Sequence, residues 1–162
     1  MEDQKEWRLY EEFIPTLIKS AHFSGRQIDK VQSGRNNRMQ GKSGVFHQID
    51  VSFFETPKYP EGFIVTPTRV NLYLIECKCL SSKVGLGIVR NHRAVIEDVQ
   101  QVQAQEVVVK GMVMTTLGVT PDAQKYADEY KIVIQPVPRH MQSFSLAFDS
   151  FLLAAAPLVV SG

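Results

Sequence analysis

The stretch VNLYLIECKCL, residues 70–80, predicts a β-strand at the centre of a sheet, because both of its faces are largely apolar. Alternation along the strand gives one face Leu72, Leu74, Glu76, Lys78 and Leu80, and the other Tyr73, Ile75, Cys77 and Cys79. An ion removed from water costs several kcal/mol unless it is paired or bound to a metal. Glu76 and Lys78 are therefore either a partly buried ion pair or part of a functional site.

A second carboxylate, Asp50, lies in the preceding predicted strand, HQIDVSFFE, residues 47–55. Apolar and polar residues alternate along it, with Ile49, Val51 and Phe53 set against Gln48, Asp50 and Ser52. A long connection, ETPKYPEGF, separates the two strands, and we expect them to pair antiparallel. Such pairing would bring Asp50 within metal-sharing distance of Glu76.

This set of side chains suits metal-dependent hydrolysis of a phosphodiester. Mg²⁺ prefers oxygen ligands and keeps several waters, so Asp50, Glu76 and the backbone carbonyl of Cys77 are the expected metal ligands. Mn²⁺ is the expected substitute. Lys78 beside them can orient a water molecule and stabilise the negative charge that develops on a phosphate.

The second half of the chain predicts an α/β layer with parallel strands. A helix is expected over about residues 89–105, with Val89, Val95, Ile96, Val99 and Val102 on one side. A short strand, GMVMTT, follows, then a helix with Thr120 as N-cap and Pro121 at its first position, then the strand KIVIQPV. This order of elements favours parallel pairing.

The first forty residues are less regular. Residues 3–21 have the apolar spacing of an amphipathic helix, interrupted by Pro15. Residues 33–44, SGRNNRMQGKSG, predict a turn or mobile loop. The letters GKS within it do not make a phosphate-binding loop, because Asn36 stands where the first glycine is needed and a strand pattern follows at once.

Composition places the chain among ordinary globular proteins. Its 162 residues, 44% hydrophobic, predict a single domain, residues 1–162, with a C-terminal helical extension from about residue 141. The start of the chain has no apolar signal region, and the longest apolar run is too short to span a bilayer, so we expect a cytoplasmic protein with no membrane partner. The histidines and cysteines show no zinc-site spacing.

Four quoted segments resemble a known family. Residues 49–50, ID, and 76–78, ECK, look like the PD-(D/E)XK motif of the restriction-endonuclease-like nucleases. The segments YEEF, GKSGVFHQIDV, YLIECK and KGMVMTTLGVTPDAQKYADEYKIVI resemble, in this order, the catalytic domain of Mrr-type restriction endonucleases. The resemblance runs from about residue 7 to residue 137. It implies an α/β restriction-endonuclease-like fold, a central mixed β-sheet flanked by helices.

The resemblance also implies roles for individual residues. Asp50 and Glu76 match the metal ligands, and Lys78 matches the catalytic lysine. Glu11 matches an acidic residue that many relatives place on the first helix, although it also fits an exposed helical glutamate. Gln48, on the face of Asp50, is either a contact to the site or to DNA or a solvated strand residue. Ile49 replaces the nominal proline. Some members carry a glutamine and a lysine on the next helix, where this chain offers Gln100, Gln101 and Gln103 but no clear match to the lysine.

Basic residues cluster locally, as a nucleic-acid function of this chain would need. The net charge is only +1, but between Lys19 and Lys42 the basic residues face a single acid, Asp29. A solvated face is the alternative explanation for such a cluster. The candidate contacts to DNA are Arg35, Arg38, Lys42, Lys83 and Arg90.

The sequence therefore predicts a Mg²⁺-dependent DNA endonuclease that resembles the Mrr catalytic domain. Two alternatives stay open: a nuclease selective for branched or damaged DNA, and a non-catalytic DNA-binding or assembly subunit with the same fold. The chain has no room for the separate recognition domain that such enzymes usually carry. We therefore expect recognition through a homodimer, a separate recognition subunit, or the structure of the DNA itself.

Overall fold

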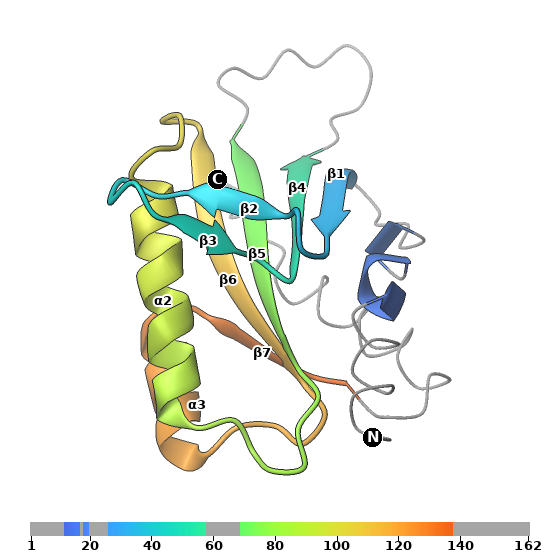
Figure 1. Ribbon diagram of the computed structural model, residues 1–162, viewed down its shortest axis with the longest axis vertical. Coiled ribbons are helices and arrows are strands. Elements are labelled where there is room, and N and C mark those ends of the chain that lie inside the picture. Colours follow the sequence, from blue (N-terminus) through green and yellow to red (C-terminus); the bar gives the residue numbers. More distant parts are fainter. Residues whose placement is uncertain (1–11, 17, 20–25, 58–68, 138–162) are drawn as a thin grey trace, which may run out of the picture.

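The computed structural model describes residues 12–16, 18–19, 26–57 and 69–137. They form a five-stranded mixed sheet, a separate two-stranded hairpin and flanking helices (Figure 1). The sheet strands are β1 (Arg26–Ser33), β4 (Val51–Pro57), β5 (Val70–Lys78), β6 (Val107–Thr115) and β7 (Val133–Pro136). The hairpin consists of β2 (Arg38–Gln40) and β3 (Phe46–Gln48), and the labelled helices are α2 (Leu86–Gln100) and α3 (Pro121–Glu129). Residues 12–16 and 18–19 are also helical.

The sheet has the order β1-β4-β5-β6-β7, so β5 is its central strand, as its sequence predicts. β4 pairs antiparallel with β1 and with β5, whereas β5, β6 and β7 run parallel. Both the antiparallel pairing of the two site-bearing strands and the parallel second half are confirmed. The described helices have no segment long and apolar enough to cross a membrane.

Separate apolar clusters cover the two faces of β5. On one face Tyr73, Ile75 and Cys77 pack with Ile14 and Ile18 from the N-terminal helical residues. On the other face Leu72 and Leu74 pack with Val99 of α2 and with Val109 of β6, among others. The predicted division of the strand into two apolar faces is therefore confirmed, and Glu76 and Lys78 belong to the face that α2 covers.

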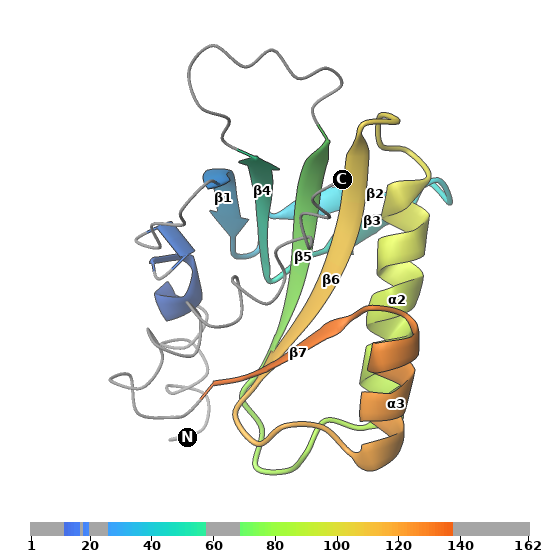
Figure 2. The same ribbon diagram turned by 180° about the vertical axis from the view of Figure 1, so that it is seen from behind.

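Both helices lie on the same side of the sheet. Figure 2, seen from behind, shows α3 beside α2, next to β6 and β7. Ala123 and Ala127 of α3 pack with Val89 of α2 and Val113 of β6. Thr120 caps α3 through its side chain, with Pro121 at the start, as predicted. The helix predicted over 89–105 is shorter: α2 ends at Gln100, and Val102, expected on its apolar side, is 49% exposed in the turn that follows.

The strand predicted over residues 47–55 is interrupted at Ile49 and Asp50. Ile49 packs in the cluster under α2, whereas Val51 and Phe53 pack on the opposite face, so the expected shared face is wrong for Ile49. The reason is Asn37, which is 4% exposed. The backbone carbonyl of Asn37 accepts a hydrogen bond from the Ile49 N–H at 2.9 Å. The side-chain Nδ2 of Asn37 donates to the backbone carbonyl of Ile49, also at 2.9 Å. These bonds take Ile49 out of any strand ladder and place Asp50 immediately before β4.

The loop predicted over residues 33–44 is also partly wrong, because it contains β2. Strand β1 had no visible alternation in the sequence, since the register of its pairing shifts between Asp29 and Gln32. Lys30 within this bulge has a φ of +52°, the left-handed region. The bulge separates Ile28 and Val31 by three positions, yet both pack against the same core cluster. The proposed C-terminal helical extension from about residue 141 lies outside the described residues.

Candidate active site

Asp50 and Glu76 meet where β4 begins and β5 ends. Val51 pairs with Ile75 in the antiparallel register, and one further step along both strands sets Asp50 opposite Glu76. The Asp50 Oδ2 accepts a hydrogen bond of 2.8 Å from the backbone N–H of Cys77. Lys78, two residues beyond Glu76 on the same face, places its Nζ 2.5 Å from Glu76 Oε1. The three charged side chains are therefore brought together.

The electrostatics of this group are those of carboxylates forced close to each other. Burial raises the pKa of Asp50, and the negative charge of Glu76 raises it further, against the opposing effects of the Cys77 N–H and of Lys78. Burial by itself lowers the pKa of Lys78, but the hydrogen bond to Glu76 and the nearby carboxylates outweigh it, so the pKa of Lys78 is raised. Lys78 consequently stays protonated at neutral pH.

A cavity of about 300 Å³ opens beside the charged group. Its wall contains Glu76 and Lys78 from β5, with Gln48 and Ile49 from the end of the hairpin. The opposite wall is formed by α2 residues, namely Ile88, Asn91, His92 and Val95. Because Glu76 and Lys78 keep about a quarter of their side-chain surface exposed, they are accessible to a substrate at the cavity.

His92 is a residue of this cavity that the sequence pattern did not single out. It is 5% exposed, and its Nε2 lies 3.0 Å from the carbonyl oxygen of Leu74. Burial lowers its pKa, although the charge of Glu76 opposes the shift. His92 is therefore a neutral side chain held against β5. Its position three residues after Val89 on the buried side of α2 was the available signal.

The donor set fits Mg²⁺. Asp50 and Glu76 offer hard oxygen ligands. Burial and, second, the charge of Glu76 raise the pKa of Asp50, and a divalent cation would offset both effects. Within the described part of the chain, no three or more His, Cys, Asp and Glu side chains are grouped so that they could hold a metal ion together. Two carboxylates with waters are the usual protein contribution to a Mg²⁺ site, whereas a structural zinc site needs more ligands. Glu11, the third predicted acid, lies outside the described residues.

The predicted DNA-contacting residues fall in two places. Arg35, Arg38 and Lys42 are exposed on and beside the hairpin, and Lys83 is exposed in the loop between β5 and α2. Arg90, by contrast, lies with its guanidinium 5.6 Å from the ring centre of Tyr126 on α3. The structure thus places Arg90 on the α3 side of α2, away from the residues that line the cavity.

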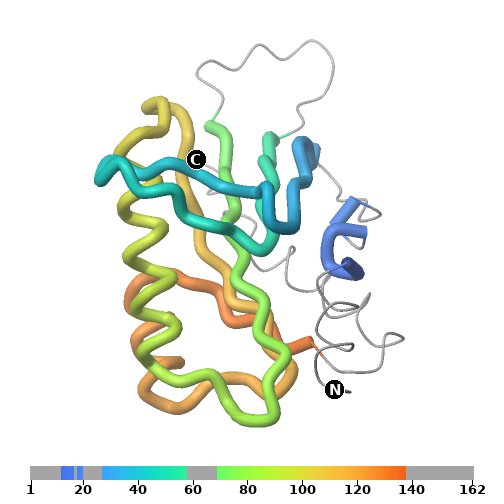
Figure 3. Tube along the Cα trace, viewed as in Figure 1, coloured from blue at the N-terminus to red at the C-terminus, as the bar shows by residue number. Residues whose placement is uncertain are grey.

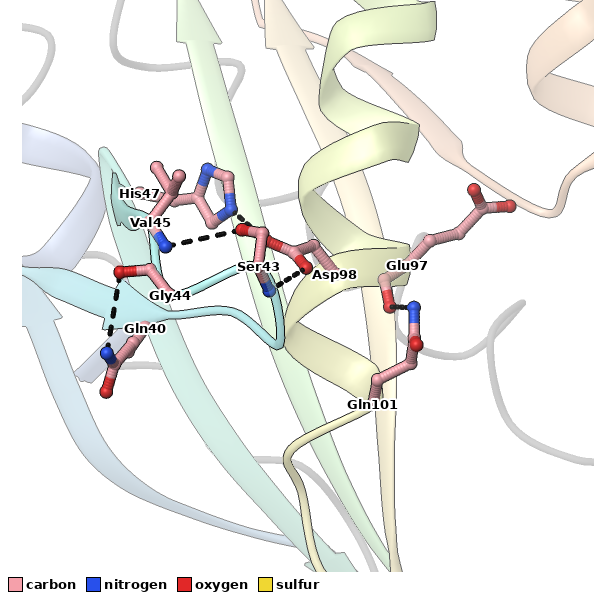
Figure 4. Close-up of polar contacts among 8 residues, drawn as sticks. All are labelled: Gln40, Ser43, Gly44, Val45, His47, Glu97, Asp98 and Gln101. Atoms are coloured by element: carbon pink, nitrogen blue, oxygen red, sulfur yellow. Dashed lines mark hydrogen bonds and ion pairs between the residues drawn. The ribbon is translucent and has the colours of Figure 1, made fainter.

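The GKS letters take part in a different polar group, which joins the hairpin to α2 (Figure 4). Asp98 of α2 accepts hydrogen bonds from the Ser43 N–H at 2.9 Å and the Ser43 hydroxyl at 2.6 Å, and its Oδ2 lies 2.7 Å from His47 Nε2. Both Ser43 and His47 bind the same carboxylate, so His47 does not stand between serine and aspartate as it would in a hydrolase triad. We call these three residues the Asp98 clamp.

Comparisons with known proteins bear on the family and the fold. A model of the restriction endonuclease family Mrr_cat matches residues 3–137. Among solved structures, a protein of unknown function, AF1548, is 19% identical with a TM-score of 0.57, over 88% of this chain and 66% of that one. This likeness supports the fold. No curated protein sequence matches the chain.

Two further solved structures are more distant. EndoMS in apo form is 9% identical with a TM-score of 0.46, over 80% of this chain and 46% of that one. The MspJI restriction endonuclease in complex with a 27-mer oligonucleotide is 13% identical with a TM-score of 0.42, over 95% and 31%. The chain thus spans 66% or less of the length of each of these solved proteins.

Proposed function

The chain belongs to the restriction endonuclease family Mrr_cat, and on this premise we propose that it is a Mg²⁺-dependent DNA endonuclease. The observation that carries the proposal is the meeting of Asp50, Glu76 and Lys78 at the edge of a cavity. Glu76 and Lys78 lie on the largely apolar strand β5, and Asp50 immediately precedes the largely apolar strand β4. Such a cluster of charges with perturbed pKa values in a cleft is typical of a functional site.

The residues have separate roles in the proposed hydrolysis. Asp50 and Glu76, together with the backbone carbonyl of Cys77, hold the metal, with Mn²⁺ as a substitute for Mg²⁺. A bound Mg²⁺ supplies Lewis-acid chemistry, which favours a nucleophilic water and offsets the charge on the phosphate. Lys78 is protonated, so it acts as a hydrogen-bond donor that orients water and stabilises negative charge rather than as a base. Glu76 holds the Lys78 ammonium group in place.

The DNA is proposed to reach the cavity across the basic hairpin. Arg35, Arg38 and Lys42 would contact phosphates on one side and Lys83 on the other. We further propose that residues 1–162 form one nuclease domain that acts in the cytoplasm. Cutting both strands needs two active sites, which a homodimer would provide, and a separate recognition subunit is the second proposed partner.

The substitution Asp50→Asn tests this proposal. The amide oxygen of asparagine can still accept the Cys77 N–H, so the fold is kept while the negative charge is lost. Cleavage of a labelled DNA duplex in Mg²⁺ should be abolished. Asp122→Asn, on the exposed first turn of α3, is the matched control and should cleave as the unaltered chain does.

The result that would contradict the assignment is full cleavage by a folded Asp50→Asn variant. DNA binding without hydrolysis, by the unaltered chain in Mg²⁺ and in Mn²⁺, would instead support the non-catalytic binding subunit. The charged cluster argues against that alternative, because a protein without catalysis gains nothing from holding two carboxylates together at a partly buried site.

A further inference from the structure

The outer face of the β2–β3 hairpin carries side chains suited to reading DNA bases. Arg38 pairs with Gln48 and Gln40 pairs with Phe46 across the two strands, so these four side chains share one face. All four are exposed, and Phe46 is 61% exposed. We call this set, Arg38, Gln40, Phe46 and Gln48, the hairpin face.

The opposite side of the hairpin explains why this face is left free. Met39 pairs with His47, and both are half-buried. Met39 packs against the apolar cluster under α2, and His47 is bound in the Asp98 clamp. Folding therefore uses one side of the hairpin and leaves the Phe46 ring exposed on the other.

The hairpin is held in a fixed position over the sheet. Figure 3 shows it running across the front of the sheet to the end of α2. Besides the clamp, the Lys42 N–H donates to the carbonyl of Asp98 at 3.1 Å, which satisfies one of the carbonyls left open at the end of the helix. Gly41 is buried so closely against this residue that a Cβ would lie 1.9 Å from Asp98 Oδ2. A rigid support of this kind is what precise contact with a ligand requires.

Charge and position favour DNA as the ligand. Residues 31–49 contain Arg35, Arg38 and Lys42 and no Asp or Glu. Gln48 belongs both to the hairpin face and to the wall of the cavity that holds Glu76 and Lys78. A duplex lying on the hairpin face would therefore also lie beside the charged group.

The residue types match the chemistry of base edges. The major groove of duplex DNA admits a two-stranded β-ribbon. In that groove arginine pairs with guanine, glutamine pairs with adenine, and phenylalanine contacts the methyl group of thymine. The Gln40 Nε2 donates only a long hydrogen bond of 3.4 Å to the Gly44 carbonyl, which a base could replace.

We propose that the hairpin face enters the major groove and gives this nuclease its sequence preference. The proposal rests on the proposed function, since it names how the same site would select its DNA. Arg38 contributes both charge and base contact, whereas Gln40 and Phe46 contribute base contacts only. The Asp98 clamp acts as a positioning device, because it fixes the face relative to the cavity.

The test uses the full chain with Lys78→Ala, which prevents cleavage, and a pool of random-sequence DNA duplexes. Bound duplexes are recovered and sequenced, and affinity for the preferred sequence is measured at several salt concentrations. The unaltered face should enrich a consensus. Adding Gln40→Ala or Phe46→Ala should relax one or two positions and weaken binding about tenfold without changing the salt dependence. Adding Arg38→Ala should also lower the salt slope by about one.

Matched controls separate these effects from folding. Gln124→Ala on α3 changes a second exposed glutamine, and Leu117→Ala removes another apolar side chain that is 45% exposed; both should leave the consensus unchanged. Unchanged preference in the Gln40 and Phe46 variants would overturn the proposal, as would a chain that binds duplexes without any consensus. A third outcome concerns anionic phospholipid vesicles. If the chain binds these vesicles, and Phe46→Ala loses that binding but still binds duplex DNA, the proposal is overturned in favour of a membrane surface.

The same set of measurements distinguishes the two levels of the account. If the unaltered chain cleaves DNA but the hairpin variants keep its preference, only the inference about the hairpin face fails. If the unaltered chain neither cleaves nor binds duplex DNA, the proposed function fails and the inference fails with it.

Discussion

At the scale of single residues, the charge of Asp50 opposes the stability of the fold, although the same charge is needed for the proposed metal binding. Its carboxylate is partly buried next to Glu76, and both effects raise its pKa. The Cys77 N–H and Lys78 compensate only in part. A carboxylate that destabilises its own fold in the absence of a ligand is typical of a site whose ligand is a cation.

This opposition predicts that Asp50→Asn stabilises the metal-free chain. A carboxyl group whose pKa is raised on folding stabilises fully below its ordinary value of 3.8, and that contribution is lost as the pH rises through the raised pKa. At neutral pH the neutral amide should therefore give a higher free energy of unfolding than Asp50. Below pH 3.8 the difference should vanish.

Urea unfolding in EDTA at several pH values measures this difference. The exposed Asp122 is the control, because Asp122→Asn should give no gain at neutral pH. A lower stability of Asp50→Asn at neutral pH would show that the charge of Asp50 is satisfied without a cation, and would weaken the proposed metal site.

The residues of the site that lie on or beside the strands could be predicted from the sequence. Asp50, Glu76 and Lys78 follow from charges at otherwise apolar strand positions, and the structure brings them together. His92 and Asn91 could not be placed in the same way, because a helix position says which side is buried but not which strand lies opposite. Arg90 is the converse case. Its place in the sequence after the central strand suggested that it borders the site, but in the structure its guanidinium lies over the ring of Tyr126.

At the scale of elements, the side chain of Asp98 joins the hairpin to α2. Three hydrogen bonds, led by that of His47, lower the pKa of Asp98 to about 2. A carboxyl group with a lowered pKa stabilises above its ordinary value of 3.8, and this contribution is lost as the pH falls through about 2. The clamp should therefore persist in moderately acidic solution.

We predict that Asp98→Asn releases the hairpin from α2. Asparagine has one acceptor oxygen where aspartate has two, so the contacts of Ser43 and His47 cannot all be kept. Hydrogen exchange at the Ser43 amide should become faster, while the amides of β5 and β6 should keep their protection. Gly41→Ala should have the same effect, because its Cβ would collide with Asp98.

The matched control is Gly87→Ala, since a Cβ at Gly87 meets no atom within 4 Å. Unchanged exchange at Ser43 in the Asp98 and Gly41 variants would mean that the hairpin is held without the side chain of Asp98, by the bond from Lys42 to the Asp98 carbonyl and by the packing of Met39.

The elements that the sequence did not predict are those in which backbone geometry interrupts a pattern. The bulge at Lys30 removes the alternation of β1, and the bonds from Asn37 to Ile49 divide one predicted strand into β3 and β4. Neither feature can be recognised from the periodicity of the sequence, because each depends on contacts between residues that are far apart along the chain. The regular elements, β5, β6, β7 and α3, were predictable because their apolar spacing or capping residues are local.

At the scale of the whole molecule, the central sheet separates two apolar layers and carries the site at one end. Phe53 of β4 and Tyr73 of β5 stack with ring centres 4.8 Å apart on the face opposite α2. The charged group lies on the other face, beside the cavity. The stability of the fold and the proposed chemistry therefore depend on different side chains.

This separation predicts opposite outcomes for two phenylalanines. Phe53→Ala should lower the free energy of unfolding by about 3–5 kcal/mol, because Phe53 is fully buried. Phe46→Ala, at an exposed position of the hairpin, should change it by less than about 0.5 kcal/mol. Urea unfolding of both variants measures this, and a large loss for Phe46→Ala would show that its ring has a structural role.

The central claim, that this chain hydrolyses DNA with Asp50, Glu76 and Lys78, is tested most directly on supercoiled plasmid. The purified chain and its Lys78→Ala variant are incubated with the plasmid in Mg²⁺, in Mn²⁺ and in EDTA. The account predicts nicked or linear DNA from the unaltered chain in either metal, none in EDTA, and none from the variant. Cleavage that persists in EDTA or in folded Lys78→Ala would contradict it.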